Sequence, residues 1–227
     1  MEQDTQTSKL FDGFDLKEGA TISELQKAYI EKTSQIKFQR VILNETKLKE
    51  DFLSYHDSYL RLLKHYASLS PSINLGFRYP EYTWKFMFNQ GLYSLLKDNL
   101  ILAGERFQEA YKLNANQPLL LIYLGIILSW RKNYYAAEKY LSTAIKLDTA
   151  NDDAWFYLGE NFFRAGALTK AIETLERAKR INPNRTEIAF KIKEIRENAE
   201  VRRKKTRKES TWKRLIHAVA DVLRTKK

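Results

Sequence analysis

The residues best suited to catalysis or metal binding are scattered along this 227-residue chain. Histidine occurs three times, as His56, His65 and His217. None has a second histidine three or four residues away, the spacing that places two metal ligands on one helix face. The lone glycines Gly13 and Gly76 are too few for a phosphate-binding loop, and no serine or threonine stands in a nucleophile elbow. Cysteine is absent, which excludes disulfides and thiolate metal sites. We expect no catalytic residues, no metal and no cofactor.

Positive charge, in contrast, is concentrated near the C-terminus. Residues 186–227 carry +8 of the net charge of +11. Positions 202–208 hold six Lys/Arg in seven residues, and an amphipathic stripe follows them. Such a segment could contact anionic lipid or nucleic-acid phosphates, while the alternative is a solvated capping helix with a basic outer face. The candidate residues are Arg202, Arg203, Lys204, Lys205, Arg207, Lys208 and Trp212.

The elements that carry these residues are predicted to be helices. Only 4 Pro and 8 Gly interrupt a sequence rich in Leu, Lys, Glu, Ala and Ile. The uncharged stretch LLLIYLGIILSW, residues 119–130, falls short of the ~20 residues that span a bilayer and suits a buried core helix. No signal-peptide pattern is present at the N-terminus, so we expect a cytoplasmic protein, with peripheral membrane contact through the tail as the alternative.

An internal repeat of 34 residues organises the second half of the chain. Gly91, Gly125 and Gly159 keep this spacing. Three further sets of small or apolar residues keep it as well: Ala103, Ala137 and Ala171; Ala110, Ala144 and Ala178; Phe107, Leu141 and Leu175. Small residues at fixed positions allow two helices of one unit to approach closely. The period therefore predicts three stacked helix–turn–helix units, at 84–117, 118–151 and 152–185.

The pattern resembles the tetratricopeptide repeat, most clearly in AWFYLGENFFRAGALTKAIETLERAKRINP of the third unit. In that family the first helix of each unit lines a concave groove. The resemblance places in the groove Phe88, Leu92, Ile122, Ile126, Trp130, Phe156 and Phe163. Family members that bind chaperone C-termini carry Lys and Asn where this sequence has Phe88 and Leu92, so that use is not implied. An apolar groove needs cover, either from a partner or from the chain's own N-terminal helices or tail.

Upstream of the repeats the sequence is aperiodic and predicts further helices. Thr21 followed by Glu24 is a capping-box start, and Leu25 and Tyr29 continue a helical stripe. A second amphipathic helix is expected over about 46–66. With Phe14, Ala20 and the pattern of Phe52, Tyr55, Tyr59 and Leu62, these segments resemble a DnaJ-type J domain over about residues 10–68.

The residues that carry J-domain activity are missing from this resemblance. A J domain stimulates ATP hydrolysis by its DnaK-type partner through a His-Pro-Asp turn, and the aligned residues here are Lys37, Phe38 and Gln39. The one His-Asp pair, His56-Asp57, lacks the proline and is expected to be an exposed pair on a helix. We therefore expect a degenerate J-like module that does not stimulate such an ATPase.

The sequence as a whole predicts an all-α protein. A J-like helical module, 1–68, is followed by a linker at 69–83, a three-unit tetratricopeptide superhelix over 84–185, and C-terminal helices over 186–227. We expect a protein-interaction scaffold and no enzyme. The alternatives are a regulator of a chaperone system, or an adaptor that reaches a membrane or nucleic acid through its basic tail.

Overall fold

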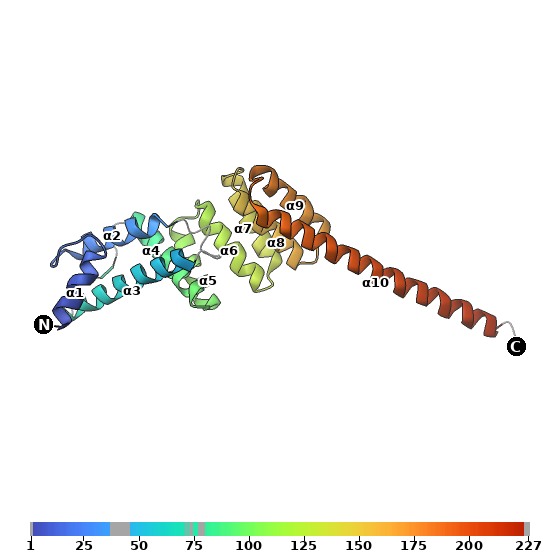
Figure 1. Cartoon of the computed structure of the whole chain (residues 1–227). Helices are drawn as coiled ribbons and strands as arrows, with labels where there is room; N and C mark the ends of the chain where they lie inside the picture. Colours follow the sequence, from blue (N-terminus) through green and yellow to red (C-terminus); the bar gives the residue numbers. More distant parts are fainter. Residues whose placement is uncertain (1, 37–45, 71, 73–74, 77–79, 225–227) are drawn as a thin grey trace. The chain divides into compact units, whose positions relative to one another are not determined.

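The computed structural model describes residues 2–36, 46–70, 72, 75–76 and 80–224, and over these residues the chain forms helices and no strand (Figure 1). The all-helical fold expected from the sequence is confirmed. The chain divides into two compact units, Met1–Arg131 and Lys132–Lys227. The linker expected at 69–83 lies within the first unit, because the helix that follows it packs on the N-terminal helices.

The described part of the first unit contains six helices, which follow one another along the chain. They are α1 Glu2–Asp12, α2 Ile22–Ser34, α3 Thr46–Leu69, α4 Pro80–Leu96, α5 Leu100–Leu113 and α6 Pro118–Trp130. The expected capping box opens α2. Thr21 Oγ1 accepts a hydrogen bond from the Glu24 amide at 3.3 Å, and Glu24 Oε2 accepts one from the Thr21 amide at 2.7 Å. Two donors at the helix start are satisfied in this way.

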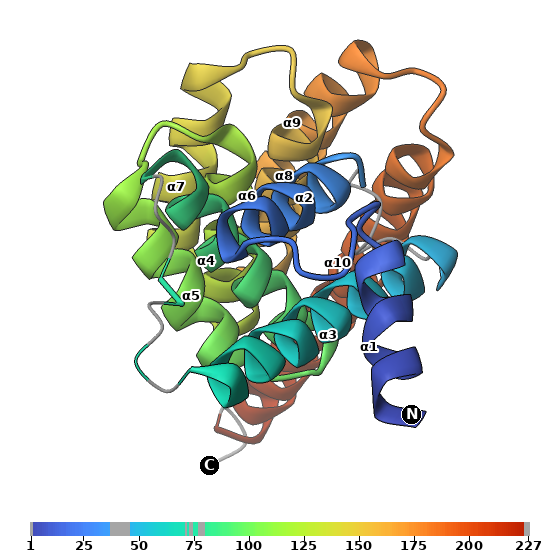
Figure 2. The same cartoon turned by 90° about the vertical axis from the view of Figure 1, so that its left-hand side faces the viewer.

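Aromatic side chains close the N-terminal helices around one core. Tyr29 of α2 stacks on Tyr59 of α3 with ring centroids 4.2 Å apart, and Phe11 of α1 meets Tyr66 of α3 edge-on at 6.2 Å. Leu25 is fully buried in the same cluster. Each of these pairs adds about 0.5–1.5 kcal/mol to the burial of its apolar surface. The result is a bundle in which α2 contacts both α3 and α4 (Figure 2).

Buried polar side chains fasten the first repeat helix to this bundle. Gln26 Nε2 donates to the carbonyls of Leu75 and Gly76 at 3.3 and 3.0 Å, which fixes the segment before α4 against α2. Asn89 Nδ2 of α4 donates to Thr33 Oγ1 of α2 at 2.8 Å. Because buried polar groups without partners are costly, both contacts favour one arrangement of α4 on α2.

A residue with left-handed backbone conformation recurs every 34 residues, with the same period as the sequence repeat. Asp98, Lys132 and Gly166 all have a left-handed φ, of 58°, 63° and 82°. Each sits in the turn between the two helices of a predicted repeat. In the first two repeats the next residue, Asn99 or Asn133, caps the second helix, and its Oδ1 accepts an amide hydrogen bond. The same turn is thus built three times.

Glycine and alanine permit the close helix approach that the repeat requires. A Cβ at Gly91 would lie 2.5 Å from the ring of Phe107, and one at Gly159 would lie 2.6 Å from Leu175 Cγ. Ala103 and Ala171 are fully buried. A larger side chain at these positions would separate the helices of a hairpin, so the spacing read from the sequence has the expected packing role.

The second unit consists, over its described residues, of three shorter helices and one long one. They are α7 Tyr134–Leu147, α8 Asp152–Arg164, α9 Leu168–Ile181 and α10 Thr186–Arg224. The first turns of α10 bury Ile188, Ile192 and Ile195 in a cluster shared with α8 and α9. The remainder of α10 runs beyond the other helices of its unit (Figure 1). The helix therefore caps the repeats with one half and exposes the other.

One expectation is wrong. His56 is fully buried, whereas the sequence suggested an exposed His-Asp pair. Its ring stacks on Tyr93 of α4 with centroids 4.4 Å apart, and its Nδ1 lies 2.6 Å from the Tyr29 hydroxyl. His56 lies four residues after Phe52 and three before Tyr59, so it falls on the apolar stripe of α3, and α4 covers that stripe.

Candidate functional site

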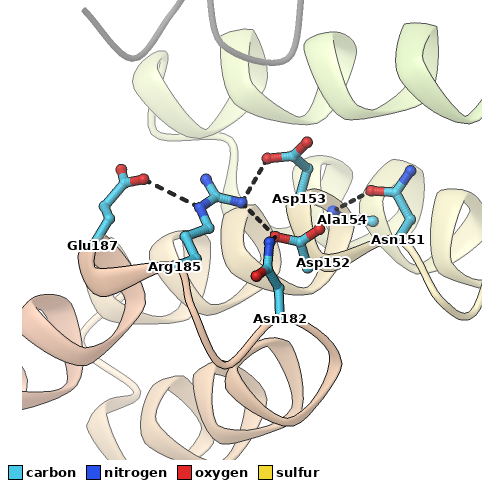
Figure 3. A network of polar contacts seen from close by, with 7 residues as sticks. All are labelled: Asn151, Asp152, Asp153, Ala154, Asn182, Arg185 and Glu187. Atoms are coloured by element: carbon cyan, nitrogen blue, oxygen red, sulfur yellow. Dashed lines mark hydrogen bonds and ion pairs between the residues drawn. The ribbon is translucent and has the colours of Figure 1, made fainter.

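The first turn of α8 holds Arg185, the residue just before α10 (Figure 3). Arg185 Nη1 lies 2.9 Å from Asp152 Oδ2 and 2.7 Å from Asp153 Oδ1, and its Nε lies 3.2 Å from Glu187 Oε2. The guanidinium also stands over the ring of Phe156 at 4.5 Å. Burial by itself would lower the pKa of Arg185, but the three surrounding carboxylates raise it, so the side chain stays charged.

A lysine repeats this arrangement two turns further along α10. Lys191 Nζ lies 3.0 Å from Glu160 Oε1 of α8 and 2.8 Å from Glu194 Oε2 of α10. It also stands over the ring of Phe163 at 5.5 Å. Phe156 and Phe163, two predicted groove residues, therefore lie beneath basic side chains of the chain itself.

Together these contacts hold the first turns of α10 against α9 and α8. The isoleucines of α10 pack chiefly on α9, and two cations at the edge of this interface meet carboxylates and aromatic rings of α8. Sequence reasoning missed Arg185 and Lys191. The available signal was the acidic pair Asp152-Asp153 at a helix start, with an arginine close to one repeat length away in the chain.

The remaining groove residues lie on α4 and α6 in the first unit. Phe88 contacts Phe107 and Tyr123, each with ring centroids 5.5 Å apart. Leu92, Ile122 and Ile126 are buried as well, and Trp130 at the end of α6 is 36% exposed. Nine of the 13 residues of α6 are buried, as expected for a helix without charge. Trp130 is the accessible member of this set.

The basic candidates lie on the exposed half of α10. The side chains of Arg202, Arg203, Lys204, Arg207 and Lys208 are exposed, and Trp212 is 66% exposed. The side chain of Lys205 lies outside the described residues. This half of the helix therefore presents cations together with an aromatic ring.

Lys37, Phe38 and Gln39, the positions aligned with the His-Pro-Asp turn, lie outside the described residues. Among the residues that the structure describes, no group of three His, Cys, Asp or Glu could hold a metal ion. Over the same residues, no helix combines the length and apolarity needed to cross a membrane.

Comparison with known protein families and curated proteins gives a family match and distant relatives. Residues 131–191 match the tetratricopeptide repeat family model. The transcriptional regulator HilA of Salmonella typhimurium and that of Salmonella typhi are each 28% identical to this chain over 127 residues. That region is 56% of this chain and 23% of HilA, so the chain spans less than a quarter of the length of these relatives.

Solved structures show the same fold at low identity. MamA from Desulfovibrio magneticus RS-1 has a TM-score of 0.53 and 18% identity, covering 79% of this chain and 88% of that one. The first TPR domain of human RPAP3 has a TM-score of 0.52 and 17% identity, covering 56% of this chain and 98% of that domain. The Arabidopsis OM64 TPR domain has a TM-score of 0.51 and 17% identity, covering 53% and 99%. The family match places a tetratricopeptide repeat at residues 131–191, and the solved structures are similar to this chain in fold.

Proposed function

We propose that the chain is a non-catalytic adaptor that binds a partner protein through the inner faces of its repeats. Tetratricopeptide repeats typically mediate protein–protein interaction, using the curved surface that stacked units create. The packing of α10 on α9 and α8 supports the proposal. The last repeat of this chain holds an amphipathic helix by buried isoleucines and two paired cations. A repeat that binds one such helix within the chain is suited to bind a similar segment of a partner.

The partner surface we propose lies on α4 and α6 around Trp130, the exposed residue among the predicted groove positions of these two helices. The other predicted groove residues of these helices, Phe88, Leu92, Ile122 and Ile126, are already buried within the chain. Helix α6 is uncharged along its length. The partner segment should therefore be more apolar than α10. Its first contact would be Trp130, the exposed aromatic residue of the set, since large aromatic side chains often dominate binding energy.

A paired capture experiment tests this proposal. The wild-type chain, Trp130→Ala and Tyr135→Ala are used as baits, and the partner captured by the wild type is purified and titrated against all three. Tyr135 is 83% exposed on α7 and serves as the matched aromatic control. We expect Trp130→Ala to weaken binding by about tenfold or more, the effect of removing an interface hot spot, and Tyr135→Ala to leave it unchanged. Equal affinity of all three chains would contradict the proposed surface.

We also propose that α1–α3 form a J-like module that does not stimulate a DnaK-type ATPase. Its support is the capping box at Thr21 and the burial of Phe14, Leu25, Tyr29 and Tyr59, residues on which the resemblance depends. The residues aligned with the active turn differ in type from His-Pro-Asp. The module would then position the first repeat, to which Gln26 and Asn89 connect it.

A second candidate function concerns the exposed half of α10. Its observation is the exposed cluster of cations at residues 202–208, directly followed by Trp212. We propose that it contacts phosphate groups of an anionic surface, with each basic residue near a membrane contributing about 1 kcal/mol. The HilA relatives are named transcriptional regulators, so duplex DNA is tested beside anionic vesicles.

Two variants separate the sources of phosphate. Neutralising Arg202, Arg203, Lys204 and Lys205 should abolish binding to vesicles and to DNA at low salt. Trp212→Ala should weaken vesicle binding alone, because apolar insertion has no counterpart in a purely phosphate contact. If the full chain binds neither surface at low salt, the proposal is wrong and this half of the helix is only a solvated extension.

A further inference from the structure

An exposed apolar stripe runs along α10, from the part that packs on α9 into the part beyond the other helices of its unit. Phe190 is 70% exposed, Val201 is 65% exposed and Trp212 is 66% exposed. They are spaced by 11 residues, about three helical turns, and therefore lie on one face of the helix. Ile188, Ile192 and Ile195 define the roughly opposite, buried face. Within its own unit, the outward face of α10 leaves large apolar side chains in contact with solvent.

The charged residues along this stripe change sign at Val201, its central residue. Glu194 and Glu197 lie between Phe190 and Val201, with side chains 49% and 66% exposed. Lys208 lies between Val201 and Trp212 and is exposed, and the sequence places a second lysine at position 205. Lys193 pairs with Glu197 on the same helix, but an exposed pair of this kind holds a carboxylate weakly. Lys191 pairs with Glu194 and with Glu160 of α8, so Glu194 shares its cation with a second carboxylate. The stripe is acidic before Val201 and basic after it.

The order of these residues makes the stripe complementary to itself in one orientation. If a second copy of α10 lies antiparallel with the two Val201 residues facing each other, Phe190 of one copy meets Trp212 of the other. Glu194 then meets Lys208, and position 197 meets position 205. In a parallel pair, each charge would meet its own kind. A two-fold axis at Val201 therefore brings apolar residues together and opposes unlike charges.

We infer that the chain forms a homodimer through antiparallel pairing of α10 about Val201. The stripe could be covered by a lipid surface, by a nucleic acid or by a second copy of the chain. Its self-complementarity favours the second copy, because a lipid or nucleic-acid surface offers no partner for Glu194 and Glu197. The inference does not depend on the partner surface proposed for α4 and α6, and it is an alternative to the anionic-surface contact, because Lys208 and Trp212 cannot serve both at once.

The dissociation constant of the full chain, measured by sedimentation equilibrium, tests the pairing. Glu194→Lys should weaken the dimer by about tenfold or more, since it opposes two lysines across each of two symmetry-related contacts. Adding Lys208→Glu to that variant should restore the dimer. Glu200→Lys makes the same charge change on an exposed residue off the stripe and should leave the dissociation constant unchanged. Because Glu194 also pairs with Lys191, thermal melts establish that each variant is folded at the temperature of the measurement.

Disulfide trapping then tests the register, because the chain has no cysteine of its own. Val201→Cys should form disulfide-linked dimers on mild oxidation. Glu194→Cys alone should not, whereas a mixture of Glu194→Cys and Lys208→Cys chains should. A wild-type chain that stays monomeric at its highest soluble concentration overturns the inference. It is also overturned if Glu194→Cys chains link to themselves, which is the parallel result, or if the double charge reversal fails to restore the dimer.

Discussion

Arg185 Nη1 lies 2.7 Å from Asp153 Oδ1, and this contact joins the start of α10 to the first turn of α8. The two side chains are only 13% and 10% exposed, so neither charge is well hydrated apart from its partner. Asp152 and Glu187 complete the network around the guanidinium (Figure 3). A buried charge of this kind is tolerated because its partners compensate for the lost hydration. Removing one partner leaves the other charges buried and unpaired, which destabilises the fold.

We expect Arg185→Met to lower the free energy of unfolding by about 3 kcal/mol, because Asp153 is left buried without its counter-charge. Urea denaturation followed by circular dichroism measures the change. Arg196→Met is the matched control on the same helix, since Arg196 pairs with Glu176 at 3.0 Å but is 61% exposed and should cost less than about 1 kcal/mol. Equal losses in the two variants would show that the Arg185 network is no more than a surface contact.

Glycine-to-alanine substitutions should have opposite signs at two helical positions. Gly159→Ala should destabilise the chain by about 1–3 kcal/mol, because the new Cβ would lie 2.6 Å from Leu175 Cγ. Gly104→Ala should be neutral or stabilising by up to about 1 kcal/mol, since its nearest neighbour is Ile127 Cγ2 at 3.4 Å and alanine favours the helix. Thermal melts decide the matter, and a stabilised Gly159→Ala variant would refute the close helix approach.

Stability should fall in mild acid because of His56. Burial lowers the pKa of this histidine to about 4, below the ordinary value near 6.5. Between those two pH values the unfolded chain binds a proton that the folded chain excludes. The contribution is therefore complete above about pH 6.5 and is lost as the pH falls toward 4, by about 3 kcal/mol in total.

His56→Phe should remove this part of the pH dependence, because phenylalanine can stack on Tyr93 in the same way and does not titrate. The difference in unfolding free energy between wild type and variant, followed by calorimetry from pH 7 to pH 4, isolates the effect from that of the carboxylates. A difference that stays constant across this range would mean that His56 remains protonated, or is accessible to water, in the folded chain.

The J-like resemblance can be tested by restoring the missing residues. The wild-type chain should leave the steady-state rate of a DnaK-type ATPase unchanged. If α1–α3 have the J-like arrangement, the combined substitution Lys37→His, Phe38→Pro and Gln39→Asp should produce stimulation. A scrambled substitution of the same three positions is the control. Stimulation by the wild type, lost on deleting residues 1–70, would instead show an active co-chaperone.

Periodicity predicted the repeats because it records packing that recurs. Gly91 and Gly159 occupy equivalent positions, and each is required by a side chain of the partner helix. The left-handed turn residues Asp98, Lys132 and Gly166 were harder to recognise, because only one of them is glycine. Their conformation follows from the hairpin geometry that surrounds them, and residue type alone is a weak guide to it.

Contacts between distant segments could not be derived in the same way. His56 and Tyr93 are far apart in sequence, and their stacking depends on α4 folding back over α3. Lys191 falls within the basic segment 186–227 and Arg185 lies just before it, although each pairs with a carboxylate of α8. Charge counting assigns such residues to solvent by default, whereas the structure pairs them with carboxylates that lie about one repeat earlier.

Hydrogen–deuterium exchange on the chain with and without its captured partner tests the adaptor proposal most directly. The proposal predicts that the partner slows exchange chiefly in peptides from α4, 80–96, and α6, 118–130. Peptides from α9, 168–181, provide the internal reference and should exchange at the same rate in both samples. Protection confined to α5, α7 or the exposed half of α10, with α4 and α6 unchanged, would contradict the claim that the inner faces of the repeats bind the partner.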